Sequence, residues 1–244
     1  MIYHILLASG LSRRFGGNKL LYPVDGIPMY LRALRCAVFV RRRLGTRIIF
    51  VTSSRELAKK AVMEAAKAEG EGHTGRNQTE EPAGEYWPSA RIQAVLNDRP
   101  EEGISRSIRL GIQAAGAGPE DWLLFSVCDQ PWLTGEEVCR LAESALSSGR
   151  GIAALSRNEE AGNPVLFKGS YADELLALTG DRGGKAVLKR HWEDVLLVEA
   201  EHEKPLRDWE GSPGLKKGGG GKKWPQHSGG FVSIESHRPL KFIR

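Results

Sequence analysis

Short apolar runs alternate with segments of helical periodicity over roughly the first 200 residues, and this alternation limits the fold more than any other feature. Runs rich in β-branched and aromatic residues predict strands over 2–7, 47–52, 91–96, 122–127, 151–156, 165–167 and 195–198. Apolar residues at helical spacing predict helices over 28–44, 55–69, 104–115, 135–146, 172–178 and 185–192. Ser54 and Thr134 are the expected N-caps of two of these helices. Strands that alternate with helices are typical of βαβ units, so we expect an α/β fold with a largely parallel sheet.

Two segments depart from this alternation. Residues 70–90 are polar, contain several Gly, Pro and Glu residues and show no periodicity, so we expect a long loop there. After residue 211 the chain contains four consecutive glycines, at 218–221, with a pair of lysines on each side. Such a composition cannot build a packed core and is typical of flexible segments. The sequence therefore predicts one domain over residues 1–211, followed by a basic tail over 212–244.

The positive charge of the chain is concentrated in that tail. Residues 212–244 carry seven of the 35 Lys and Arg residues but one of the 30 Asp and Glu residues, which leaves 28 basic and 29 acidic residues elsewhere. The predicted domain is therefore near neutral, and a basic nucleic-acid-binding surface is not expected.

Composition also bears on the compartment. No apolar run approaches the ~20 residues of a membrane span, and no basic region precedes the first apolar run as it would in a secretory signal. The three cysteines, Cys36, Cys128 and Cys139, form no CxxC pair. We therefore expect a reduced, cytoplasmic protein without a cysteine-built zinc site.

The segment after the first predicted strand has the composition of a phosphate-binding loop. It consists of small residues, then Arg13 and Arg14, two glycines and Lys19. Small residues allow a backbone to approach a ligand closely, and turned backbone N–H groups and cationic side chains can bind a polyphosphate. Because Lys19 is followed by Leu20 rather than Ser or Thr, and G-x-G-x-x-G is absent, this is neither a Walker A loop nor a dinucleotide-binding loop. Taken alone, a glycine-rich turn with solvated arginines would explain the same residues.

This loop resembles the L-A-x-G-x-S-x-R-x-G-x-x-K signature of the MobA-like nucleotidyltransferases, and within them it is most similar to the molybdenum cofactor cytidylyltransferases. Four further segments resemble motifs of that family in the same order. They are Gly103-Ile104-Ser105-Arg106-Ser107-Ile108, Cys128-Asp129-Gln130-Pro131, Gly162-Asn163-Pro164-Val165-Leu166-Phe167 and Gly180-Asp181-Arg182-Gly183-Gly184-Lys185. The resemblance covers roughly residues 1–190. It implies a three-layer α/β/α, Rossmann-like fold of the nucleotide-diphospho-sugar transferase type, with a mostly parallel twisted sheet.

The resemblance also implies roles for individual residues. The residues that would bind the nucleotide are Leu7, Ala8, Ser9, Gly10, Ser12, Arg13, Arg14, Lys19, Gly103 and Ser107. The residues that would lie beside the second substrate are Gly162, Asn163, Pro164, Asp181, Gly183, Gly184 and Lys185. Arg14 and Lys19 would contact the phosphates and, with Asp129, form the catalytic set. The plain alternatives are a helix N-cap for Ser105 and an Asp-Gly turn at a helix start for Asp181.

A divalent metal is expected at Asp129, which follows the apolar run 122–127 and precedes Pro131. Mg²⁺, or Mn²⁺ in its place, is commonly held by one or two carboxylates together with substrate phosphates and water. The family would supply a second carboxylate from an Asp-Ile-Asp-Thr-Pro-like segment. Here the corresponding stretch keeps Asp208 and Glu210 as acids but otherwise departs from that pattern. Both are candidate metal ligands.

Other residues with catalytic potential have structural interpretations. Cys128 adjoins Asp129, but a thiol is a poor Mg²⁺ ligand, so we expect a packed core cysteine. The six histidines show no metal-binding spacing, and His4 alternates with apolar residues of the first strand as a structural residue would. Ligands of open α/β sheets bind beyond the carboxyl ends of the strands. Because Ser9, Ser105 and Asp129 each follow a predicted strand, we expect them to meet at one edge of the sheet.

The implied reaction transfers CMP from CTP to the terminal phosphate of molybdopterin or the molybdenum cofactor and releases pyrophosphate, for the maturation of molybdenum hydroxylases. A phosphate monoester has a second pKa near 6, so the acceptor is largely ionised at neutral pH and needs no protein base. The resemblance favours CTP over GTP. Where this chain has Ser9 and Gly10, guanylyltransferase relatives usually have two glycines and the cytidylyltransferases usually have Ala-Gly, so Ser9 is small but matches neither pattern. Open alternatives are a GTP-using molybdopterin guanylyltransferase, a sugar-phosphate nucleotidyltransferase and a non-enzymatic cofactor carrier for a hydroxylase apoenzyme. A nucleic-acid-binding module that uses the tail is not favoured.

Overall fold

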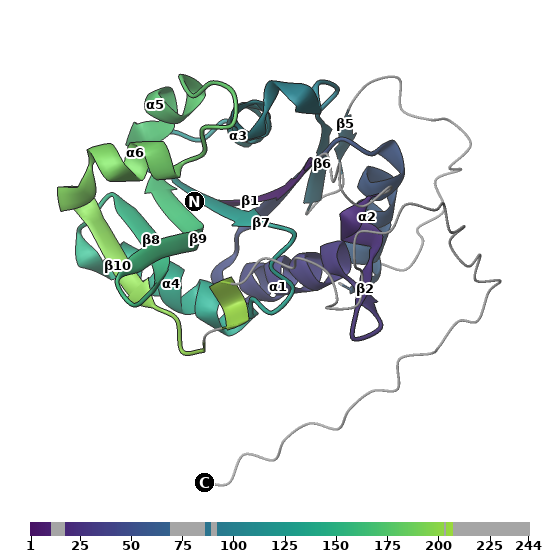
Figure 1. Cartoon of the computed structure of the whole chain (residues 1–244), viewed down its shortest axis with the longest axis horizontal. Helices are drawn as coiled ribbons and strands as arrows, with labels where there is room; N and C mark the ends of the chain where they lie inside the picture. Colours follow the sequence, from purple (N-terminus) through teal and green to yellow (C-terminus); the bar gives the residue numbers. More distant parts are fainter. Residues whose placement is uncertain (11–17, 69–85, 89–91, 203, 207–244) are drawn as a thin grey trace, which may run out of the picture. The chain divides into compact units, whose positions relative to one another are not determined.

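The computed structural model describes residues 1–10, 18–68, 86–88, 92–202 and 204–206 (Figure 1). All of these belong to one unit, Met1–Trp209, and residues from Glu210 to Arg244 form a second unit. The predicted basic tail lies outside the described residues, as do five candidate site residues. These are Ser12, Arg13, Arg14, Asp208 and Glu210. What the sequence predicts for them stays a prediction.

The described strands of the main sheet are β1 (Ile2–Ala8), β4 (Arg47–Thr52), β5 (Tyr86–Pro88), β6 (Ile92–Leu96), β7 (Trp122–Val127), β8 (Ile152–Arg157), β9 (Glu160–Lys168) and β10 (Val195–Glu199). Their order in the sheet is β10-β8-β9-β7-β1-β4-β6-β5. β1 pairs in parallel with β4 and β7, β4 pairs in parallel with β6, and β8 pairs in parallel with β10. β9 is antiparallel to both β7 and β8, and β5 is antiparallel to β6. The sheet is therefore mostly parallel, as expected.

Helices cover both faces of this sheet, which gives the expected three layers. The helices are α1 (Met29–Leu44), α2 (Arg55–Ala68), α3 (Ile104–Ala115), α4 (Gly135–Ser148), α5 (Ala172–Leu176) and α6 (Lys185–Arg190). In Figure 1, α1, α2 and α4 lie on one side of the sheet and α3, α5 and α6 lie on the other. The three-layer α/β/α prediction is confirmed. Among the described residues, no helix combines the length and the apolar character that crossing a bilayer requires.

Two helical layers explain why the central strands are apolar at nearly every position. Successive side chains of a strand point to opposite faces of the sheet. Ile5 packs in one cluster with Ile108 of α3, whereas its neighbour Leu6 packs in another with Leu34 of α1 and Leu57 of α2. Each such side chain, fully buried, contributes about 1.5–3 kcal/mol relative to exposure. A strand covered on both faces therefore shows a continuous apolar run rather than alternation.

The predicted helix caps are present. The backbone N–H of Leu57 donates to Ser54 Oγ at 3.2 Å, and that of Glu137 donates to Thr134 Oγ1 at 3.3 Å. Each hydroxyl satisfies one of the backbone donors that a helix leaves unpaired at its start. Both N-cap predictions are confirmed.

Two local predictions were wrong, and one element was missed. The expected loop over 70–90 contains β5, a short strand on the edge beside β6. β9 begins at Glu160, earlier than the predicted start at 165. The prediction missed the first half of this strand because that half is polar and contains a Gly and a Pro. A small hairpin, β2 (Pro23–Val24) with β3 (Ile27–Pro28), was not predicted, although Asp-Gly is a common signal for a two-residue turn.

Candidate functional site

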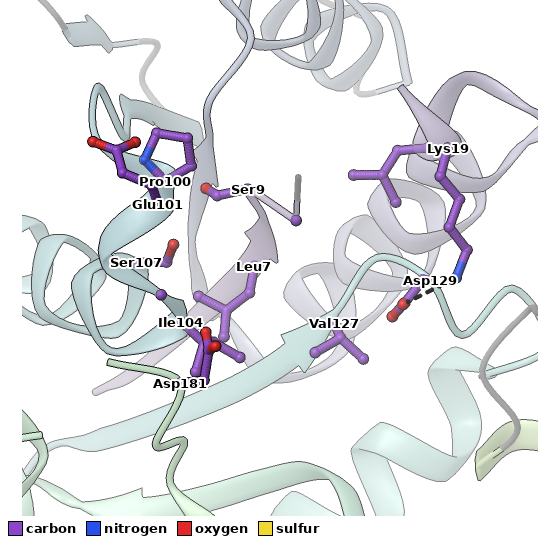
Figure 2. A pocket seen from close by; sticks show the side chains of 13 residues that line it. Leu7, Ser9, Lys19, Pro100, Glu101, Ile104, Ser107, Val127, Asp129 and Asp181 are labelled. Atoms are coloured by element: carbon purple, nitrogen blue, oxygen red, sulfur yellow. Dashed lines mark hydrogen bonds and ion pairs between the residues drawn. The ribbon is translucent and has the colours of Figure 1, made fainter. Parts of the chain in front are cut away.

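A cavity of about 440 Å³ lies at the carboxyl ends of the central parallel strands (Figure 2). Its walls come from the ends of β1 and β7, from the start of α3 and from the loop that precedes α6. The residues that line it are Leu7, Ser9, Gly10, Lys19, Leu20, Pro100, Glu101, Gly103, Ile104, Ser107, Val127, Asp129 and Asp181. Segments that are far apart in sequence meet here because the strand order places β1 between β4 and β7. We call this space the first cavity.

The end of β1 contributes backbone rather than polar side chains to the first cavity. Ser9 is buried, and its hydroxyl donates to the carbonyl oxygen of Val51 at the end of β4, 3.2 Å away. Among the described residues other than its chain neighbours, none has an atom within 4 Å of the position where a Cβ of Gly10 would lie. Ala8 is buried in the core cluster of Leu6 and does not line the cavity. Small residues at this point therefore leave room for a ligand beside the backbone.

An ion pair at one wall of the first cavity joins the segment after β1 to the turn after β7. Lys19 Nζ lies 3.3 Å from Asp129 Oδ2, as Figure 2 shows. The Lys19 side chain is 15% exposed and that of Asp129 is 34% exposed. The 3₁₀ turn Lys19–Leu21 is held by Asn18, whose side chain accepts from the Leu20 N–H at 3.0 Å. A cation and a carboxylate are thus fixed at one wall of the cavity.

Cys128 anchors the turn that carries Asp129. Its N–H donates to the Leu7 carbonyl at 3.2 Å, which ties the end of β7 to β1. The Cys128 side chain is 1% exposed, and burial raises the pKa of its thiol well above the ordinary value. A buried neutral thiol is not a metal ligand. The prediction of a packed core cysteine is confirmed.

The start of α3 touches the loop at Gly180. The Ser105 N–H donates to the Gly180 carbonyl at 3.1 Å, and a Cβ at Gly103 would lie 2.4 Å from that carbonyl. Gly103 also has a φ of +87°, a region that side-chain-bearing residues rarely adopt. This contact brings Asp181 to the first cavity. The expected capping role of Ser105 was wrong, since α3 has Gly103 at its N-cap and Ser105 Oγ makes no hydrogen bond.

A buried polar network lies behind Ser107 and was missed from the sequence. Asn97, which follows β6, is 1% exposed, and its Nδ2 lies 3.0 Å from Ser107 Oγ. Asn97 Oδ1 accepts from the Arg99 N–H and from Arg106 Nε, each at 3.1 Å. A single asparagine after an apolar run is a weak signal in one sequence, because such residues are common in turns.

A second, smaller cavity of about 200 Å³ adjoins the first. Leu7, Ile104 and Val127 line both cavities, so the two spaces share a wall. The other residues that line the second cavity are Ile108, Phe125, Ala161, Gly162, Asn163, Val165, Phe167, Leu175, Gly183, Gly184, Lys185 and Leu188. Of the predicted second-substrate residues, Pro164 does not line it and Asp181 lines the first cavity instead.

The carboxylates of the first cavity do not converge. Glu101, Asp129 and Asp181 lie at different walls in Figure 2, and no group of three or more His, Cys, Asp or Glu residues in the described part of the chain could hold a metal ion. A site with one protein carboxylate still suits Mg²⁺, which commonly takes its remaining ligands from substrate phosphates and water. Asp129 fits that requirement, because its side chain is 34% exposed and lines the cavity.

The family model of the MobA-like NTP transferase domain matches residues 4–195, a span that contains both cavities. The chain belongs to this family. It is thus a nucleotidyltransferase of the MobA-like type, and its Lys19, Asp129 and Gly103 lie in the cavity of a MobA-like fold. A search of curated protein sequences finds no significant match.

Three solved structures illustrate the fold that this chain shares with other proteins. A nucleotidyl transferase from Methanothermobacter thermautotroptrophicus has 22% identity and a TM-score of 0.60, with 85% of this MobA-like chain and 91% of that chain covered. A 4-diphosphocytidyl-2C-methyl-D-erythritol synthase from Anaerococcus prevotii has 13% identity and a TM-score of 0.58, with 86% and 91% covered. Molybdopterin-guanine dinucleotide biosynthesis protein A from Archaeoglobus fulgidus has 16% identity and a TM-score of 0.51, with 82% and 84% covered. At these identities the likeness shows a common fold.

Proposed function

We propose that this protein transfers CMP from CTP to the terminal phosphate of molybdopterin or the molybdenum cofactor, with release of pyrophosphate. The observation that carries the proposal is a pair of adjoining cavities with Lys19 and Asp129 at the wall of the larger one. Two substrates must meet in nucleotidyl transfer. The first cavity is assigned to the nucleotide and the second to the acceptor.

Positioning and charge are what this chain supplies to the reaction. The acceptor phosphate is already ionised at neutral pH, so no side chain has to remove a proton from it. Lys19 provides a fixed cation for the charge of the triphosphate and of the leaving pyrophosphate. Arg13, Arg14 and Ser12 of the first loop are proposed to add further phosphate contacts.

Asp129 is the residue proposed to hold Mg²⁺ or Mn²⁺, with Asp208 and Glu210 as further candidate ligands. When bound, such an ion neutralises phosphate charge and orients the phosphate groups for in-line attack. Lys19 pairs with the same Asp129 carboxylate at 3.3 Å, so the proposed metal and the Lys19 cation would act at the same wall of the first cavity.

The lining of the second cavity favours a flat, ring-containing acceptor over a sugar phosphate. Apart from the amide of Asn163 and the ammonium of Lys185, its side chains are apolar. A polyol would bury several hydroxyls there, and each one without a partner would cost about 1–3 kcal/mol. A fused heterocycle such as a pterin presents apolar ring faces, and its polar edge can reach backbone groups of Gly162, Gly183 and Gly184. This supports molybdopterin, the acceptor class in the name of the Archaeoglobus neighbour.

The test is pyrophosphate release with CTP, GTP, ATP and UTP in turn, each with Mg²⁺ and either molybdopterin or 2-C-methylerythritol 4-phosphate. We expect release with CTP and molybdopterin, and none with CTP and the polyol phosphate or with CTP and no acceptor. Release with the polyol phosphate alone would move the assignment to a sugar-phosphate enzyme, and release with GTP alone to a guanylyltransferase. Folded protein that binds molybdopterin but turns over no nucleotide would indicate a carrier that delivers cofactor to a hydroxylase.

A further inference from the structure

The orientation of the Asn97 side-chain amide is fixed by its neighbours. Its Oδ1 accepts from the Arg99 backbone N–H and from Arg106 Nε, both at 3.1 Å. Each of these groups is a donor that cannot accept, so the amide atom that faces them must be the oxygen. Arg106 is held in turn by ion pairs with Asp98 and Glu102. The Asn97 Nδ2 is therefore the amide atom that faces Ser107.

This orientation decides the polarity of the Ser107 hydroxyl. Asn97 Nδ2 lies 3.0 Å from Ser107 Oγ, and an amide nitrogen donates and cannot accept. Ser107 Oγ thus accepts the hydrogen bond from Asn97, and its own proton is left for another acceptor. Among the described residues no acceptor takes that proton, and Ser107 lines the first cavity. The hydroxyl can consequently donate a hydrogen bond into the first cavity.

The place of Ser107 in the first cavity indicates which part of the ligand it meets. Figure 2 shows Ser107 and Pro100 at the opposite wall from the Lys19–Asp129 pair. If the phosphates lie beside Lys19, the nucleoside end of the ligand lies beside Ser107. A hydroxyl donor suits a ring carbonyl oxygen there, such as the one that a pyrimidine carries next to its sugar-bearing nitrogen. An amino group of the base in the same place would be a second donor, so it could not accept the hydrogen bond from Ser107.

We infer that Asn97 is a positioning residue for base recognition: it holds the Ser107 hydroxyl as a donor to a carbonyl oxygen of the nucleobase. The inference rests on the proposed nucleotide-binding function of the first cavity. It adds a residue that lies outside the cavity wall and acts through Ser107. It also predicts that the hydrogen-bond polarity at Asn97, rather than its size, matters for nucleotide affinity.

The Asn97→Asp variant tests this with almost no change in shape. Its carboxylate still accepts from Arg99 and Arg106, but the second oxygen can only accept. Ser107 must then donate to that oxygen and can no longer donate to the base. We expect the Kd of CTP to rise roughly tenfold, the same as for Ser107→Ala, because one neutral hydrogen bond is lost in each case.

Two measurements separate this effect from the added negative charge. Inorganic tripolyphosphate has no base, so its Kd reports the charge alone and is expected to change about twofold or less. In the Ser107→Ala background, adding Asn97→Asp should raise the Kd of CTP by no more than it raises the Kd of tripolyphosphate, because the hydroxyl has already been removed. 2′-Deoxy-CTP should show the same loss as CTP, since the partner is on the base and not on the ribose.

Several outcomes would overturn the inference. Equal losses for CTP and tripolyphosphate would reduce Asn97→Asp to a charge effect, and full additivity with Ser107→Ala would mean that Asn97 does not act through Ser107. A loss seen with CTP but absent with 2′-deoxy-CTP would place the partner on the ribose. If the folded wild type bound tripolyphosphate but no nucleoside triphosphate, the proposed function itself would fail, and the inference with it. Thermal unfolding of each variant confirms that it is folded.

Discussion

Lys19 Nζ lies 3.3 Å from Asp129 Oδ2, although 110 residues separate the two in sequence. The contact follows from the strand order: β1 and β7 are neighbours in parallel, so the segments beyond their carboxyl ends lie side by side. Both side chains are partly exposed, and such ion pairs contribute about 0–1 kcal/mol to folding. The pair therefore bears on the chemistry of the first cavity far more than on stability.

Replacement of Asp129 by Asn should abolish turnover without unfolding the protein. If this carboxylate holds the metal, the barrier should rise by about 3 kcal/mol or more, which is over a hundredfold in rate. Pyrophosphate release measures the rate, and urea unfolding should change by less than about 1 kcal/mol. The matched control is Asp25→Asn, which removes an exposed carboxylate paired with Arg32 at 3.0 Å and should leave activity intact. Normal turnover of Asp129→Asn would remove this residue from the mechanism.

Lys19→Gln should weaken nucleotide binding, because a fixed cation beside the phosphates is lost. A charge-assisted contact of this kind is worth roughly 1.5–3 kcal/mol, so calorimetry should show the Kd of CTP rising about ten- to a hundredfold. Lys60→Gln is the control, since Lys60 pairs with Glu56 on the surface of α2. An unchanged Kd for Lys19→Gln would place the phosphates elsewhere in the cavity.

Gly103→Ala should destabilise the fold as well as the site. The new Cβ would lie 2.4 Å from the Gly180 carbonyl, and the φ of +87° is strained for alanine. Together these should cost more than about 2 kcal/mol in the free energy of unfolding. Gly116→Ala separates the two causes, because its φ is +57° but nothing lies within 4 Å of its Cβ position. That control should lose about 1 kcal/mol; equal losses would mean that the contact with Gly180 is unimportant.

Val165→Thr should weaken acceptor binding selectively. The change keeps the shape of the side chain but places a hydroxyl in the apolar wall of the second cavity. An unpaired buried hydroxyl costs about 1–3 kcal/mol, so the KM for molybdopterin should rise roughly tenfold while the Kd of CTP stays constant. Val198→Thr, in β10 and away from both cavities, is the matched control for folding. A parallel rise in the CTP Kd would show that the two cavities do not divide the substrates.

His4 should make stability depend on pH. Its side chain is fully buried, hydrogen-bonds Ser126 at 2.8 Å, and burial lowers its pKa from 6.5 to about 3. Below pH 6.5 the unfolded chain binds a proton at His4 that the folded chain cannot bind. Stability is therefore complete above pH 6.5 and falls as the pH decreases toward 3.

The measurement is urea unfolding at about pH 7.5 and about pH 5. Between them the wild type should lose ~2 kcal/mol more than His4→Gln, which cannot titrate. Equal pH dependence of the two proteins would show that His4 is not the group responsible. The expectation that His4 is structural is confirmed by its full burial.

The layers of the fold could be predicted because both faces of the sheet are covered. Apolar runs such as Leu123–Leu124 mark strands buried on two sides, and the helices between them have regular apolar spacing. The first half of β9 could not be predicted, since Gly162 and Pro164 are poor strand formers that pairing with β8 overrides.

Site residues that directly follow a strand could be predicted from the sequence. A residue that acts by supporting another residue could not be predicted. Asp129 and Ser9 follow apolar runs directly, so the edge rule for parallel sheets locates them. Asn97 follows an apolar run too, but its importance comes from the amide orientation that Arg99 and Arg106 impose. Such an orientation is a three-dimensional property that spacing does not encode.

The wall shared by the two cavities limits how this enzyme could acquire a new substrate. Leu7, Ile104 and Val127 line both spaces, so a substitution at any of them alters both cavities, and under the proposed function both substrates. Substitutions that change the acceptor without changing nucleotide binding are instead expected on β9, at positions such as Ala161 and Val165, which line only the second cavity. Descendants of this chain are thus expected to diverge in acceptor along β9 while the three wall residues stay fixed.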